Sequence, residues 1–203
     1  MHQQNPSRRT LFARIAGAAL ALSFAGSAFA FENPQVAIKT SVGEIVVELD
    51  AEHAPKSTAN FMQYVKSGFY KGTVFHRVID GFMIQAGGYT EKLIDKPGVR
   101  KPIQSESKNG LSNKPYTLAM ARTADPHSAA SQFFINVNDN AGLDYPGQDG
   151  YGYTVFGRVI KGQEIVDKIK GVVVDDMRGM QNVPVTPIVI RSTTVLTGEK
   201  LVK

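Results

Sequence analysis

The sequence predicts a mainly β fold, in which about eight short strands and two helices form a closed or nearly closed antiparallel barrel. Short runs of β-branched and aromatic residues recur along the chain, and glycine, proline, asparagine or aspartate interrupts them. Only two segments have apolar residues at helical spacing, so strands do not alternate with helices as in a parallel sheet. The 203 residues are 42% hydrophobic and 20% charged, which is typical of a globular protein.

The first expected element is a pair of antiparallel strands. Residues 35–40 and 44–49 are rich in β-branched side chains. The three residues between them, 41–43, end in glycine, as in the short connections that close hairpins. We therefore expect both strands to lie side by side at the start of the fold.

Two helices are expected. The first covers residues 55–67, because Pro55 suits the first turn of a helix, apolar residues follow at helical spacing, and Gly68 can end it. The second is a shorter helix over residues 163–170.

The other expected strands are short and separated by turn residues. Residues 87–115 between two of them contain prolines and glycines but also apolar residues, so we expect an ordered surface segment rather than a linker. Within it, Gly87 and Gly88 are interpreted as a turn signal. The predicted strands cover residues 74–79, 83–86, 116–121, 132–137, 154–160 and 186–196.

Residues 1–30 have the pattern of a cleavable signal peptide. They contain Arg8, Arg9 and Arg14 and no acidic residue, followed by an apolar run and small residues that suit cleavage after Ala30. An uncleaved membrane anchor is the alternative, although the apolar run is short of the roughly 20 residues that span a bilayer. Residues 31–203 would then form a single domain.

The export signal predicts a periplasmic location. Residues 7–12, SRRTLF, resemble a twin-arginine signal, and the general secretory route is an equally good alternative. The chain contains no cysteine, which excludes disulfides, thiolate metal sites and a cysteine nucleophile, and suits an oxidising compartment.

The basic charge of the whole chain does not indicate nucleic-acid binding. The formal net charge is +5, but after cleavage 20 basic and 18 acidic residues remain, a net charge of +2. Those basic residues are scattered singly among acidic ones, whereas a phosphate-binding surface needs a cluster. No nucleic-acid partner is expected.

Three long polar side chains interrupt predicted apolar strands. Alternation places Arg77 on one face with the apolar residues two positions away, Gln85 follows an apolar run, and Gln132 shares a face with Phe134. Burying such groups unpaired costs about 1 to 3 kcal/mol each. They therefore either satisfy one another in a structural hydrogen-bond network or line a cleft with an apolar floor.

No metal or nucleophile signature is present. His53, His76 and His127 lack the spacing of a metal site and are interpreted as surface or strand residues. Neither a phosphate-binding loop nor a serine nucleophile motif occurs. No metal or cofactor is expected.

Several motifs together resemble the cyclophilin family of peptidyl-prolyl isomerases. They are FHRVIDGFMIQAGG at residues 75–88, SQFFI at 131–135 and VFGRV at 155–159. AMARTAD at 119–125 and QNVP at 181–184 are similar to the bacterial periplasmic branch. The resemblance covers nearly all of residues 31–203. It implies a closed eight-stranded antiparallel barrel capped by two α-helices, with the site on its outer face and no cofactor.

The resemblance implies a site that works without a covalent step. Rotation about an Xaa-Pro bond has a barrier near 20 kcal/mol, and in the twisted transition state the prolyl nitrogen regains a lone pair. A donor that reaches this nitrogen stabilises the twisted state more than the planar one. Arg77 is the candidate catalytic donor. The candidate substrate-binding residues are Phe82, Met83, Gln85, Ala121, Arg122, Thr123, Gln132, Phe134, Leu143 and Tyr153.

The sequence departs from the family pattern at three places. Gly142 stands where many relatives have an aromatic residue, so weak cyclosporin binding is expected. Tyr153 replaces the histidine of eukaryotic members, and Arg122-Thr123 replaces their Asn-Ala.

The resemblance implies an isomerase for proline-containing unfolded or partly folded exported polypeptides. The alternative is a binding module or holdase chaperone that uses the same groove with incidental turnover. A monomer with no membrane anchor after cleavage is expected.

Overall fold

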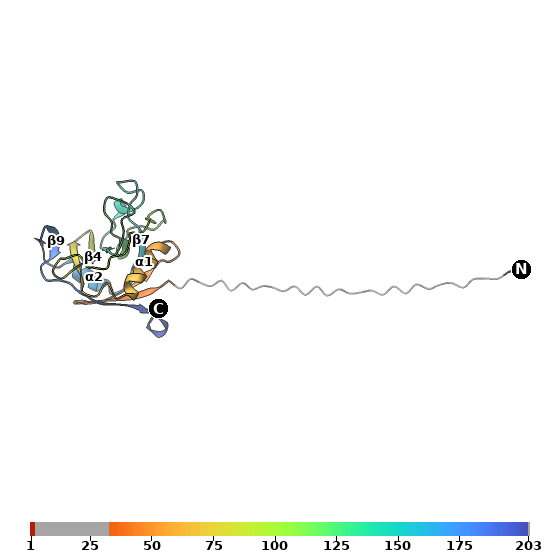
Figure 1. Cartoon of the computed structure of the whole chain (residues 1–203), viewed down its shortest axis with the longest axis horizontal. Helices are drawn as coiled ribbons and strands as arrows, with labels where there is room; N and C mark the ends of the chain where they lie inside the picture. Colours follow the sequence, from red (N-terminus) through yellow and green to blue (C-terminus); the bar gives the residue numbers. More distant parts are fainter. Residues whose placement is uncertain (3–32, 203) are drawn as a thin grey trace. The chain divides into compact units, whose positions relative to one another are not determined.

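The computed structural model describes residues 1–2 and 33–202, and in this part of the chain an eight-stranded antiparallel sheet dominates the fold (Figure 1). The strand order is β10-β1-β2-β7-β5-β6-β4-β3. The predicted signal peptide lies outside the described residues, apart from Met1 and His2. The strands of this sheet are β1 (Gln35–Thr40), β2 (Gly43–Leu49), β3 (Thr73–Ile79), β4 (Met83–Thr90), β5 (Thr117–Met120), β6 (Phe133–Asn136), β7 (Val155–Lys161) and β10 (Ile190–Leu196).

The sheet curls into a half-barrel. Its edge strands β3 and β10 approach each other at an isolated bridge between Val74 and Val189, beside a hydrogen bond from the Gly72 N–H to the Ile190 carbonyl at 2.8 Å. No continuous ladder joins these edges within the described residues. The expected eight antiparallel strands are confirmed, and the expected closed barrel is observed only as this curled sheet.

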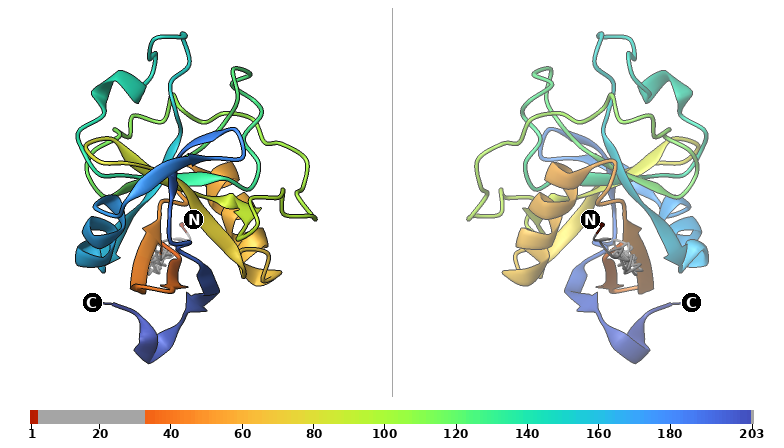
Figure 2. Two further views of the ribbon diagram at one scale, coloured as in Figure 1. Left: turned by 90° about the vertical axis from the view of Figure 1, so that its left-hand side faces the viewer. Right: turned by 90° about the vertical axis from the view of Figure 1, so that its right-hand side faces the viewer.

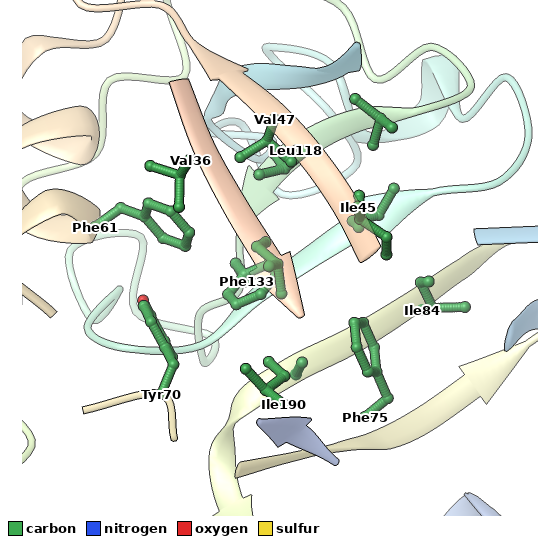
Figure 3. Close-up of a cluster of buried hydrophobic side chains, with 14 of the residues drawn as sticks. Val36, Ile45, Val47, Phe61, Tyr70, Phe75, Ile84, Leu118, Phe133 and Ile190 are labelled. Atoms are coloured by element: carbon green, nitrogen blue, oxygen red, sulfur yellow. The ribbon is translucent and has the colours of Figure 1, made fainter. Parts of the chain in front are cut away.

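Two helices pack against the sheet, as expected. Helix α1 (Pro55–Lys66) and helix α2 (Gln163–Lys170) lie on opposite sides of the strands in Figure 2. None of the described helices is long and apolar enough to cross a membrane. Buried side chains of the strands and of both helices form the main core. Figure 3 shows part of it, including Val36, Ile45, Val47, Phe61, Tyr70, Phe75, Ile84, Leu118, Phe133 and Ile190.

The N-terminus of α1 is capped by a side chain from a distant loop. Ala54 at the N-cap position has no side-chain hydrogen bond to offer. Instead, the carboxylate of Glu106 accepts hydrogen bonds from the backbone N–H groups of Lys56 and Ser57 and from the Ser57 hydroxyl, each at 2.8 Å. The long loop between β4 and β5 is therefore ordered partly by its contact with this helix.

We expect Glu106→Ala to lower the free energy of unfolding by about 1 to 2 kcal/mol, because it leaves N–H groups at the start of α1 without an acceptor. Glu106→Gln keeps one acceptor oxygen and is expected to cost less. Urea unfolding followed by circular dichroism measures both variants. Equal stability of the wild type and Glu106→Ala would show that water replaces the cap without cost.

The structure adds one hairpin that was not predicted and corrects one prediction from turn residues. The hairpin of β8 (Val174–Met177) and β9 (Met180–Pro184) was not predicted, because its strands are short and largely polar. Gly87 and Gly88 lie within β4 instead of ending it. A Cβ at Gly88 would overlap the side chain of Gln132, so glycine leaves room for that side chain beside the strand.

The alternation expected for residues 75–79 is also wrong. The β3–β4 register shifts between Phe75 and Arg77. As a result Phe75 packs in the main core with Val78, whereas Ile79 packs in a second apolar cluster and Arg77 faces the adjoining cavity. The irregularity changes which face of the strand Arg77 occupies. Arg77 therefore does not share a face with Phe75.

Candidate functional site

A cavity of about 310 Å³ lies on the face of the sheet opposite the main core. It brings together nine of the eleven residues that the sequence nominated. They are Arg77, Phe82, Met83, Gln85, Ala121, Arg122, Phe134, Leu143 and Tyr153.

The cavity floor is apolar and rigidly placed by strand pairing. Met83 and Phe134 come from β4 and β6 and are 2% and 4% exposed. Phe134 is paired with Gln85 on one side and Ala119 on the other. Because Phe133 and Ile135 point into the main core, the alternation of β6 directs Phe134 to the cavity.

The remaining apolar walls come from loops. Phe82 precedes β4, and Leu143 lies in a short 3₁₀ helix, Ala141–Leu143. The ring of Tyr153 packs edge-on against Phe134, with 5.7 Å between the ring centroids. An apolar ring the size of a prolyl side chain fits the chemistry of these walls.

The three polar residues that interrupt the apolar strands, Arg77, Gln85 and Gln132, divide into a satisfied pair and a cation without a partner among the described residues. The Gln85 amide donates to the Gln132 side-chain oxygen at 2.8 Å. The Arg77 guanidinium, which is partly exposed, forms no ion pair or hydrogen bond with any described residue. The sequence left open a structural hydrogen-bond network or a cleft, and the structure contains both. The glutamines satisfy one another, and Arg77 lines a cleft with its donors available.

The two other nominated residues, Thr123 and Gln132, line a neighbouring cavity of about 300 Å³. Gln85, Ala121 and Arg122 border both cavities, so the two are parts of one groove. An extended polypeptide could place the proline in the first cavity and a flanking residue in the second. Each nominated residue therefore lies in this groove.

His76, next to Arg77, is buried and points away from the first cavity. It is 5% exposed, its ring packs against Tyr89 at 4.7 Å between centroids, and its Nδ1 has no hydrogen-bond partner. Burial, with a smaller contribution from the Arg77 charge, lowers the pKa of His76 to about 4. The imidazole is therefore neutral at pH 7. Within the described residues, no cluster of three or more acidic or histidine side chains is placed to hold a metal ion.

We expect the protein to lose stability as the pH falls from about 6.5 to 4. Unfolded histidine binds a proton below about pH 6.5, whereas folded His76 binds one only near pH 4, so acid favours the unfolded chain. The loss from His76 is about 2 kcal/mol between pH 7 and pH 5. Urea unfolding of the wild type and of His76→Gln across this range measures it. Parallel stability curves for the two proteins would contradict this assignment.

Sequence reasoning missed the residues that hold the loop walls. The Asn140 amide donates to the Phe82 carbonyl at 2.8 Å and to the side-chain oxygen of buried Asn136 at 2.6 Å. It thereby ties the turn before β4 to the segment that carries Leu143. An asparagine between two strands ordinarily indicates a turn, so the sequence offers no signal for this role.

A further cavity of similar size lies outside the groove and has different chemistry. It measures about 320 Å³ and is lined mainly by residues of β2, β7 and the segment before β5. Its arginine, Arg158, is paired with Glu48 at 2.9 Å. Because that charge is paired, this cavity does not, among the described residues, combine an unpaired cation with an apolar pocket as the Arg77 cavity does.

The comparisons with known proteins identify the family of the chain. Residues 35–195 match the family model described as cyclophilin type peptidyl-prolyl cis-trans isomerase/CLD. The chain is 55% identical over 163 residues to peptidyl-prolyl cis-trans isomerase cyp18 of Streptomyces antibioticus, covering 79% of this chain and 98% of the relative. It is 46% identical over 190 residues to peptidyl-prolyl cis-trans isomerase A of Dickeya dadantii, covering 94% and 98%.

A solved structure shows the same fold. The cyclophilin type peptidyl-prolyl cis-trans isomerase of Cryptosporidium parvum matches with a TM-score of 0.67 and 26% identity, over 82% of this chain and 99% of that one. The chain belongs to the cyclophilin-type peptidyl-prolyl cis-trans isomerase family. It is an isomerase of proline-containing polypeptides.

Proposed function

We propose that this isomerase accelerates Xaa-Pro rotation by holding the prolyl ring in the 310 Å³ cavity while Arg77 donates to the prolyl nitrogen. The observation that carries the proposal is a guanidinium that has no partner among the described residues and lies beside an apolar floor formed by Met83 and Phe134. A planar amide nitrogen is a poor acceptor because its lone pair is delocalised. The donor is therefore stronger for the twisted state than for either planar isomer.

The other groove residues position the substrate. The Gln85–Gln132 pair is available to hold the substrate backbone, and the cavity that contains Thr123 can receive a residue next to the proline. No bond to the protein forms during rotation, so this mechanism needs no nucleophile or cofactor. Lowering the barrier by about 5 kcal/mol would accelerate rotation by nearly four powers of ten.

A protease-coupled assay on a peptide with a cis Xaa-Pro bond tests the proposal. The purified protein is expected to increase the rate of cis-to-trans conversion in proportion to its concentration. Heat-inactivated protein at the same concentration is the control for a non-specific effect of added protein. No acceleration by a protein that still binds the peptide would contradict the proposed reaction.

The comparisons do not favour the holdase alternative, since the relatives are named as isomerases. The same groove could nevertheless bind segments of unfolded chains. An aggregation assay with a denatured protein lacking proline separates the two activities. Suppression of aggregation there, without isomerisation of the proline peptide, would favour a holdase.

We also propose that residues 1–30 direct export to the periplasm and are removed, so that the clients are exported proteins. Arg8 and Arg9 before an apolar run support the proposal, and cleavage after Ala30 would leave β1 intact, since it begins at Gln35. Fusing residues 1–30 to a reporter in a strain without the twin-arginine translocase distinguishes the two routes. A reporter that stays in the cytoplasm of wild-type cells would contradict export.

The proposal includes a monomer in which β3 and β10 close the barrel. The backbone hydrogen bonds from Gly72 to Ile190 and from Phe75 to Ile188, at 2.8 and 3.0 Å, support closure. A single domain with one groove needs no second copy to complete its site. Neither a membrane anchor after cleavage nor a nucleic-acid partner is part of the proposal.

A further inference from the structure

The side chain of Arg122 borders the groove, but most of its hydrogen-bond donors are bound to other protein groups. Arg122 follows β5, and its side chain is only 4% exposed. Its Nε and one terminal nitrogen donate to the Gly152 carbonyl at 3.1 and 2.8 Å, and the other terminal nitrogen donates to the Thr123 carbonyl at 3.0 Å. It also pairs with the Asp149 carboxylate. Since a guanidinium has five N–H donors, these contacts leave about one for a substrate.

The same guanidinium lies over a wall of the proline cavity. Its central carbon is 4.3 Å from the centroid of the Tyr153 ring, which in turn packs against Phe134. Tyr153 follows Gly152 directly, and its backbone N–H donates to the Leu143 carbonyl at 2.8 Å. Arg122 therefore fixes both the backbone just before Tyr153 and the ring itself.

The segment that carries Tyr153 has few other side-chain anchors to the sheet. Residues 144–152 contain no helix or strand. Asp149 accepts hydrogen bonds from the Tyr151 and Gly152 backbone N–H groups, at 3.0 and 3.1 Å, which order the segment internally. The contacts from Arg122 to Asp149 and Gly152 connect this ordered turn to the end of β5.

On the basis of the proposed function, we propose that Arg122 is a positioning residue for the isomerase. By holding Gly152 and stacking on Tyr153, it fixes the Tyr153 ring as a wall of the proline cavity. It thus contributes to substrate affinity through that ring and not by direct contact.

The chemistry of the contact requires arginine. A planar guanidinium can donate twice to one carbonyl and stack on an aromatic ring at the same time, whereas a lysine ammonium is a compact point charge. Hydrogen bonding from Arg122, and then from the two backbone N–H groups, lowers the pKa of Asp149 to about 2. The carboxylate is therefore charged, and its pairing with Arg122 persists, throughout the pH range of the assay.

The test compares Arg122→Lys, Tyr153→Ala and the double variant with the wild type. A wall that contacts the prolyl ring in all states changes KM, so Arg122→Lys is expected to raise KM about tenfold with kcat changed less than about twofold. Tyr153→Ala is expected to raise KM at least as much. Adding Arg122→Lys to Tyr153→Ala should have no further effect, because the ring through which Arg122 acts is absent. Arg158→Lys, the same change at an arginine outside the groove, is the matched control.

Peptide binding provides a second readout that does not need turnover. NMR titration with a proline peptide should show the same rise in Kd, and the Tyr153 ring resonances should shift in free Arg122→Lys. If both changes raise KM and Kd by independent factors, Arg122 contacts the substrate directly and the inference is wrong. If Arg122→Lys lowers only the urea midpoint, its role is merely structural and the inference is also wrong.

A wild type that binds the peptide without turnover would instead refute the proposed function. The Kd values of the variants would still test the role of Arg122. Asp149→Asn replaces Arg122→Lys if that variant does not fold.

Discussion

Arg77→Ala is expected to lower kcat/KM for an Xaa-Pro peptide by about 10²- to 10³-fold, the usual cost of removing one donor that acts in the transition state. The free energy of unfolding should change by less than about 0.5 kcal/mol, because the partly exposed guanidinium has no partner among the described residues. The protease-coupled assay and urea unfolding measure the two quantities.

The loss should fall mainly on kcat. The planar ground states offer Arg77 no nitrogen lone pair, so its removal weakens the twisted state selectively. Binding of the prolyl ring depends on the apolar floor and should persist. A Kd for the peptide within about threefold of the wild type is therefore expected.

Two further variants control for charge and for arginine in general. Arg77→Lys keeps the positive charge but not the planar fork, and we expect an intermediate rate. Arg158→Ala removes a different exposed arginine, which is paired with Glu48 and borders the other cavity. Its kcat/KM should equal that of the wild type. Full activity of Arg77→Ala would rule out the proposed donor.

Phe134→Ala is expected to affect both stability and activity. Phe134 is 4% exposed and packs with Met83, Ala121 and Val155, so its truncation should cost about 3 to 5 kcal/mol of unfolding free energy. The cavity also loses its floor. Losing about 3 kcal/mol of apolar contact with the prolyl ring corresponds to a fall of roughly 100-fold in kcat/KM.

Phe133→Ala is the matched control from the same strand. Phe133 is 1% exposed and lies in the main core, where it packs against Phe61 and Tyr70. Its truncation should cost a similar amount of stability but leave the activity per folded molecule nearly unchanged. If both variants lose activity equally after correction for the folded fraction, the apolar floor is not specific to Phe134. Phe134→Leu and Phe133→Leu serve if the alanine variants do not fold.

Much of the secondary structure follows from local sequence. The hairpin of β1 and β2, helix α1 from Pro55 and helix α2 over Gln163–Lys170 are confirmed within about one or two residues at each end. The polar hairpin of β8 and β9 was missed because it lacks an alternating apolar pattern. The N-cap of α1 was missed because its acceptor, Glu106, lies about fifty residues away.

The site residues were nominated from motifs, and their spatial relation required the fold. Alternation correctly separated Phe134 from the core-facing residues of β6, but it failed at Arg77 because the register shifts after Phe75. A shift of register depends on the partner strand, which the local pattern does not describe. Likewise, the role inferred for Arg122 depends on Gly152 and Tyr153, about thirty residues away.

The sequence by itself determined most of the segments that form strands and helices and, through its motifs, which side chains belong to the groove. These properties depend on local periodicity and residue type, which neighbouring residues in the sequence show directly. Only the tertiary structure decided that Arg77 has no partner among the described residues, that Gln85 is satisfied by Gln132, and that most donors of Arg122 are bound to other protein groups. Whether a polar side chain is free or hydrogen-bonded depends on which other residues the strand order places beside it.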